Sequence, residues 1–117
     1  MPREHKLYLK DMLGAIRKIE KYSEKMTLAG LSEDEMALDA IVRNLEILGE
    51  AAKNIPEHVK RKKPELEWKK VAGLRDIITH AYFGVDADII WDVVKNKIPI
   101  LKEKILELLS ESENGKE

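Results

Sequence analysis

Four polar side chains that could do chemistry lie close together between residues 73 and 84. This segment reads GLRDIITHAYFG and holds Arg75, Asp76, His80 and Tyr82 on an otherwise apolar stretch with helical character. A helix that only fills a core has little use for so many polar groups. Because an imidazole gains and loses a proton near neutral pH, the segment indicates acid/base chemistry.

The spacing of these residues limits how they can work together. Asp76 and His80 are four residues apart, so on a helix the carboxylate can accept a hydrogen bond from one ring nitrogen and leave the other free. Arg75 and Tyr82 share a face, whereas Arg75 and His80 lie about 140° apart on an ideal helix. One straight helix cannot direct both at one small group. Either the helix distorts near His80 or two chains each contribute part of the site, and we favour two chains.

Several other kinds of catalytic site are excluded by the sequence. The chain has no Cys, so disulfides, thiolate metal sites and Cys nucleophiles are ruled out. Its His, Asp and Glu residues do not have zinc-protease spacing, so we expect no metal. A glycine-rich phosphate loop and a Gly-x-Ser-x-Gly elbow are also missing from the sequence, which argues against P-loop nucleotide hydrolysis and serine acyl transfer.

The spacing of Arg75, His80 and Tyr82 is R-x4-H-x-Y, which resembles the signature of the HepT-like toxins, all-helical ribonucleases of the HEPN superfamily. Further blocks that are similar to this family occur in order over most of the chain. They cover residues 43–52, 68–82, 85–91 and 98–101. The motif together with these blocks is much more specific than an Arg and a His alone.

The resemblance implies a metal-independent endoribonuclease that acts as the toxin of a toxin-antitoxin pair. It also implies a homodimer, in which the motif helices of two protomers meet in one composite cleft with Arg75 and His80 as the catalytic pair. His80 would move the 2′-OH or leaving-group proton while Arg75 stabilises the charge on the phosphate. Asp76 would orient His80, and Arg43 and Glu50 would support the site.

Tyr82 has a different role in the family that the chain resembles. The antitoxin partner is similar to a minimal nucleotidyltransferase, which transfers AMP from ATP onto the motif tyrosine, and the toxin itself needs no cofactor. Attached AMP would fill the cleft with bulk and negative charge and exclude RNA. Without the resemblance, the residue would be interpreted as a tyrosine whose ring packs and whose hydroxyl is hydrogen-bonded.

The remaining sequence predicts the helices that must position this segment. Few aromatic residues, 5% of the chain, and long helix-forming stretches favour a single all-α bundle of four or five helices over residues 1–109. The first helix should end at residues 27–31, where Gly30 lies, and a capping box from Ser32 to Glu35 should begin the second. Other expected elements are a second helix to about residue 54, a short basic helical piece at 58–63, a third helix from 68 to 83–84, a fourth from 86 that Pro99 breaks or kinks, a final helix at 100–109, and a disordered polar tail at 110–117.

The second helix is predicted to be buried on two sides. One apolar seam runs along residues 38, 41, 45, 48 and 52, and another along residues 36, 40, 47 and 51. Gly49 would let another helix approach closely. A polar line between the seams contains Asp39, Arg43, Glu46 and Glu50. These residues either pair along the helix, as most such lines do, or face a cleft or subunit interface.

Charge is unevenly distributed along the chain. The formal net charge is −1, yet residues 53–75 carry +5 and the rest −6. Before the motif helix stands a basic run of four residues: Lys60, Arg61, Lys62 and Lys63. It is either a solvated face, a contact for the RNA backbone or a docking site for an acidic antitoxin surface.

No apolar run is long enough to cross a membrane, and the first residues do not resemble a signal peptide, so we expect a cytoplasmic protein without membrane contact. Two alternatives to the ribonuclease remain open from sequence. The chain could be a noncatalytic partner and substrate of a nucleotidyltransferase. It could also be a structural helical dimer in which Arg75, Asp76 and His80 form a buried polar network.

Overall fold

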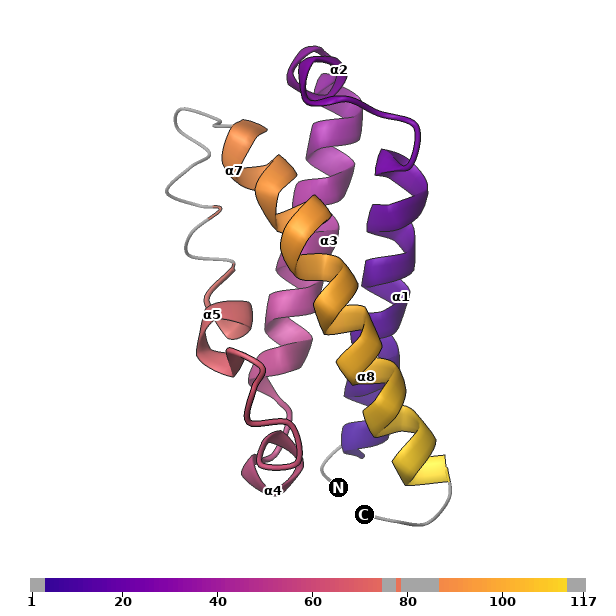
Figure 1. Cartoon of the computed structure of the whole chain (residues 1–117), viewed down its shortest axis with the longest axis vertical. Coiled ribbons are helices and arrows are strands. Elements are labelled where there is room, and N and C mark those ends of the chain that lie inside the picture. Colours follow the sequence, from indigo (N-terminus) through magenta and orange to yellow (C-terminus); the bar gives the residue numbers. More distant parts are fainter. Residues whose placement is uncertain (1–3, 75–77, 79–86, 114–117) are drawn as a thin grey trace.

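The computed structural model describes residues 4–74, 78 and 87–113 of the chain. These residues form helices and no strands, which confirms the all-α class. Figure 1 shows two long helices side by side with a third long rod crossing them, and short helices at their ends. The elements are α1 His5–Ser23, α2 Leu28–Glu33, α3 Glu35–Lys53, α4 Glu57–Lys60, α5 Trp68–Ala72, α7 Ala87–Asp92, the π-helix η2 Val93–Lys97 and α8 Ile98–Glu113.

The core lies where α1, α3 and α8 meet. Each helix contributes an apolar stripe at helical spacing, because residues three and four apart return to the same face. In α3 the predicted seam of Leu38, Ile41, Leu45, Leu48 and Ala52 is buried throughout. The other buried contributors include Leu9, Met12, Ile16 and Ile19 of α1 and Ile98, Leu101 and Ile105 of α8. Each such side chain stabilises the fold by about 1.5–3 kcal/mol through burial.

The second predicted seam of α3 is only partly covered by this chain. Ala51 is buried and Ile47 is half-buried, but Met36 is 83% exposed. Ala40, between Met36 and Ile47 in this seam, is half-buried. Within one chain, therefore, α3 is buried along one full seam, and the second seam is partly covered except at Met36, its N-terminal end.

The turn between α1 and α3 differs from its prediction. Residues 28–33 form a separate short helix, α2, which Thr27 caps by accepting a hydrogen bond from the Gly30 backbone N–H. The predicted capping box is wrong, because Asp34 Oδ1 accepts from Ala37 N and so caps α3. Ser32 belongs to α2, where its hydroxyl donates to the Leu28 carbonyl. An aspartate is an equally good cap and also places negative charge at the helix N-terminus.

The last helices form one rod rather than two separate elements. α7 passes through the π-helix η2 directly into α8, whose second residue is Pro99 (Figure 1). A proline has no N–H and its ring clashes with the carbonyl four residues earlier. A π-helical turn before it relieves this conflict without ending the helix. The predicted disruption at Pro99 is thus a change of helix type.

The two ends of this rod can be compared with the helix boundaries that the sequence predicts. α8 continues to Glu113, so the segment predicted to be a tail from residue 110 begins as helix, and residues 114–117 lie outside the described part. The predicted cap at residue 86 lies outside it too. Within the described ranges, no helix combines the length and apolarity that crossing a membrane requires.

Candidate active site

The approach to the predicted catalytic segment is firmly anchored. α5 begins at Trp68, as predicted, and this side chain is buried. The single helix predicted from residue 68 to 83–84 is wrong in its continuity, because α5 ends at Ala72 with Gly73 as its C-cap. Its indole Nε1 donates a hydrogen bond of 3.0 Å to the Lys63 carbonyl, which satisfies the one polar atom of the ring. Leu74 and Ile78, one helical turn apart in sequence, are also buried in the core. The chain is therefore held on both sides of residue 75.

The four motif residues themselves, Arg75, Asp76, His80 and Tyr82, lie outside the described residues. Their predicted roles consequently stay predictions. The structure instead defines the surroundings of the motif: the helix that leads into it, the helix on which that helix packs, and the basic segment that precedes both.

Gly49 is the point at which α5 meets α3. A Cβ atom on this residue would lie 3.1 Å from the Val71 carbonyl oxygen, 3.5 Å from Leu74 Cβ and 3.6 Å from the Ala72 carbonyl oxygen. The backbone at the end of α5 therefore rests directly on α3, at a distance that only a glycine permits without movement. This contact confirms the predicted close approach and fixes where the chain enters the motif.

A groove on another face of α3, towards α1, contains both residues that the sequence predicts as supports. Arg43 and Glu50 line a cavity of about 350 Å³ between α1 and α3. Arg43 also lies 3.8 Å from Glu46 in an exposed i,i+3 pair, which confirms the pairing along the helix. With side chains 71% and 34% exposed, this pair is worth at most about 1 kcal/mol.

The opposite wall of this groove comes from α1 and was not predicted. Tyr8 and Asp11 line it there, so the groove collects one phenol, one guanidinium and three carboxylates. Such groups can orient a partner side chain or exchange protons. The sequence signal for Tyr8 was its place at i, i+4, i+7 and i+11 with residues 12, 15 and 19, which turns it towards α3. No comparable signal points to Asp11.

The basic run divides into residues with different surroundings. Arg61 is exposed and Lys60 and Lys62 are half-buried, at or just after the short helix α4. Lys63 turns towards α8: its Nζ lies 3.0 Å from Glu107 Oε2 and 3.7 Å from Glu111 Oε1, with its side chain only 16% exposed. Its ammonium is therefore occupied within the chain, which leaves Lys60 and Arg61 better placed to meet an external anion.

This pairing shifts the ionisation of both partners. The close contact with the Glu107 carboxylate raises the pKa of Lys63, and the nearby Lys63 ammonium lowers the pKa of Glu107. Lys104 adds to the cluster, at 3.6 Å from Glu107 and 3.8 Å from Glu65. The segment between α4 and α5 is thus tied to α8 electrostatically.

Metal ligands are not assembled in the described part of the chain. No cluster of three or more His, Asp or Glu residues there is arranged to hold a metal ion.

The sequence of the chain is similar to a known protein family and to several known proteins. The model of the family "Ribonuclease HepT-like" matches residues 12–108, a span that includes Arg75, His80 and Tyr82. A "Probable ribonuclease HepT" of Thermococcus cleftensis is 44% identical over 108 residues, which cover 92% of this chain and 98% of that protein. No solved structure matches the chain significantly.

Two proteins of Methanocaldococcus jannaschii are also similar. A "Putative RNase" is 37% identical over 118 residues, covering this chain entirely and 98% of its own length. A "Gamma-glutamylcyclotransferase and putative RNase" is 40% identical over 116 residues, and the chain spans about half of that longer protein. Since the family model covers most of the sequence, from α1 to α8, the chain belongs to the HepT-like ribonuclease family.

Proposed function

We propose that this protein is a metal-independent endoribonuclease that acts as the toxin of a toxin-antitoxin pair in the cytoplasm. The observation that carries the proposal is the R-x4-H-x-Y spacing of Arg75, His80 and Tyr82 within the span matched by the ribonuclease family model. The names of the relatives, all of which include a ribonuclease, support the reaction class.

In the proposed reaction, His80 takes the proton of a ribose 2′-OH or gives one to the leaving 5′ oxygen. Arg75 stabilises the negative charge that builds on the phosphate as the 2′ oxygen attacks and the bond to the 5′ oxygen breaks. Asp76 accepts a hydrogen bond from His80 and holds it in one orientation. RNA can be cut in this way by side chains alone.

The proposed active form is a homodimer. On an ideal helix Arg75 and His80 lie about 140° apart, so a composite cleft that takes one residue from each protomer resolves the geometry. Met36, the exposed N-terminal end of the second seam of α3, is an apolar side chain that a second chain would cover. Arg43 and Glu50, in the groove between α1 and α3, would act as positioning residues.

Cleavage of a labelled RNA in excess chelator tests the enzyme. We expect cleavage by the wild type and its loss in Arg75→Ala and His80→Ala, while light scattering still detects a dimer. His58→Ala is the matched control, because His58 is exposed on α4 and outside the motif. Equal cleavage by the two motif variants would refute the assignment, and an inactive wild type would favour a noncatalytic role.

Regulation by AMP transfer is the second part of the proposal. A nucleotidyltransferase antitoxin would use ATP to modify the Tyr82 hydroxyl, and the added phosphate charge would exclude RNA from the cleft. Intact mass after co-expression with the neighbouring gene's product measures this. We expect added multiples of AMP on the wild type and on Tyr22→Phe, a control at an exposed tyrosine, but none on Tyr82→Phe. An unmodified wild type would contradict it.

A further inference from the structure

α1 carries a line of cations along its border with α8. Lys6, Lys10, Arg17 and Lys21 follow one another at intervals of four, seven and four residues, which are close to whole helical turns. They therefore form one stripe, about four turns long. Lys10, Arg17 and Lys21 are exposed and Lys6 is half-buried. In the part of the chain that the structure describes, none of the four has an ion-pair partner.

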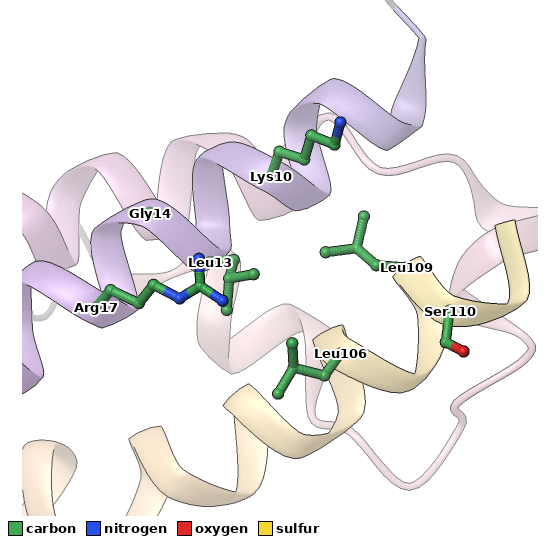
Figure 2. Close-up of a pocket in the computed structure, with 7 residues that line it drawn as sticks. All are labelled: Lys10, Leu13, Gly14, Arg17, Leu106, Leu109 and Ser110. Carbon is green, nitrogen blue, oxygen red and sulfur yellow. The ribbon is translucent and has the colours of Figure 1, made fainter. Parts of the chain in front are cut away.

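An apolar groove opens beside this cationic stripe. It measures about 530 Å³ and lies between α1 and α8 (Figure 2). The side chains of Leu13, Leu106 and Leu109 lie between the two helices, and Lys10 and Arg17 mark its α1 edge. Leu106 is 41% exposed, so water covers much of this leucine in the isolated chain.

Gly14 makes the groove accessible in its middle. A Cβ atom added at this residue would meet nothing within 4 Å. Gly14 is therefore not required by packing inside the chain, in contrast to Gly49, although a mid-helix glycine costs about 1 kcal/mol relative to alanine. Its absent side chain leaves room for another backbone to approach α1 closely.

Two carboxylates near the stripe have other partners. Glu20, which borders the stripe, is already paired with Lys102 of α8, 3.0 Å away. Glu107 of α8 lies beside Lys63 and Lys104 instead. Neither Glu20 nor Glu107 is therefore directed at Lys10 or Arg17, and carboxylates of a partner can meet these two cations.

We propose that this surface binds an amphipathic acidic helix of a partner protein. A leucine-rich seam of that helix would pack on Leu13, Leu106 and Leu109, and carboxylates at its edge would meet the cationic stripe. The groove lining contains no aromatic side chain on which a base could stack. Since sequence-tolerant binding of single-stranded nucleic acids relies on such stacking, the lining favours a helix over RNA.

The test uses the full-length protein and labelled 20-residue helical peptides in fluorescence anisotropy. One peptide has a leucine seam flanked by glutamates, and its match has lysines in place of the glutamates. A 2′-O-methyl RNA, which resists cleavage, is the third probe. The protein variants are Lys10→Glu with Arg17→Glu, and Gly14→Leu, which fills the groove. The control is Lys53→Glu with Lys69→Glu, exposed residues at the end of α3 and in α5, away from the stripe.

We expect the glutamate peptide to bind and the lysine peptide not to bind. The Lys10 and Arg17 charge reversal and Gly14→Leu should each weaken binding by about tenfold or more, and the control pair by less than about threefold. Equal losses in the control pair would overturn the proposal, as would failure of the glutamate peptide to bind. RNA binding that falls with the same variants would reassign the surface to nucleic acid, and a change in oligomeric state on light scattering would reassign it to a second copy.

Discussion

Gly49→Ala tests how the fold positions the candidate active site. The new methyl group would lie 3.1 Å from the Val71 carbonyl oxygen, whereas ordinary contacts begin near 3.4 Å. The obstacle is backbone, so α5 as a whole must shift by a few tenths of an ångström. Since α5 leads directly to Arg75, the shift is passed to the predicted catalytic segment.

The expected effect on stability is a difference between two terms. Replacing a mid-helix glycine with alanine favours the helix by about 0.8–1.0 kcal/mol. Overpacking a buried contact costs about 1–3 kcal/mol. Gly49→Ala should therefore lower the free energy of unfolding by about 0–2 kcal/mol.

Gly14→Ala supplies the matched control for this experiment. It also lies within a long helix, but an added Cβ there meets nothing within 4 Å. It should raise the free energy of unfolding by about 0.8–1.0 kcal/mol. Subtracting the two effects isolates the steric cost at Gly49, which we expect to be about 1–3 kcal/mol.

Urea unfolding followed by circular dichroism measures these energies, and RNA cleavage by fully folded protein measures the site. Because a displacement of 1 Å can cost about 100-fold in rate, a shift of a few tenths should reduce cleavage by Gly49→Ala about three- to tenfold. Gly14→Ala should cleave like the wild type. If Gly49→Ala stabilises the protein as much as Gly14→Ala does, α5 does not rest on Gly49 and the reasoning is refuted.

Four further substitutions test the fold around the site, all by urea unfolding. Asp34→Ala should lower the free energy of unfolding by about 0.5–2 kcal/mol, as loss of an N-cap does. Ser32→Ala should lower it less, and the opposite order of the two effects would support the predicted capping box. Leu45→Ala, fully buried in α3, should cost about 2–5 kcal/mol, and a loss below 1 kcal/mol would contradict its place in the core. Lys63→Met should be destabilising at neutral pH. Because the pKa of Glu107 is held below its ordinary value of 4.5, the stabilisation from this pair is present above pH 4.5 and lost as the pH falls through the lowered value. The difference between wild type and Lys63→Met should therefore shrink in acid, and a difference that grows there would contradict the pairing.

The helices and most of the core could be predicted because the signals are local. Hydrophobic residues at helical spacing gave α1 and α3 within a few residues, and the buried seam of α3 is the predicted one. Helix ends were less predictable, because Ser32 and Asp34 are both good caps and their competition is decided by the short helix α2. Pro99 signalled a disruption, but sequence alone does not distinguish a break from a π-helical turn.

The surroundings of the site depended on tertiary contacts and could be predicted only in part. The close helix contact at Gly49 could be predicted, because a glycine within an amphipathic helix lets another helix approach closely. The position of Asp11 in the groove could not be predicted, because it depends on how α1 is rotated against α3 and hydrophobic periodicity does not specify that rotation. Likewise, a run of four basic residues does not tell which one turns inwards. Lys63 does so because Trp68 binds its carbonyl and Glu107 of α8 receives its ammonium.

α3 contributes both to the stability of the fold and to the position of α5, and the two contributions can be separated experimentally. One face of this helix carries Leu45 in the core, while Gly49 supports α5 and Glu50 lines the groove. Leu45→Ala removes packing without pushing on α5, so it should lower the fraction of folded protein but leave cleavage per folded molecule unchanged. Gly49→Ala should do the reverse: a small loss of stability with a larger loss of cleavage per folded molecule. If both variants lose cleavage only in proportion to unfolding, α3 supports the catalytic segment through global stability alone and the contact at Gly49 has no positioning role.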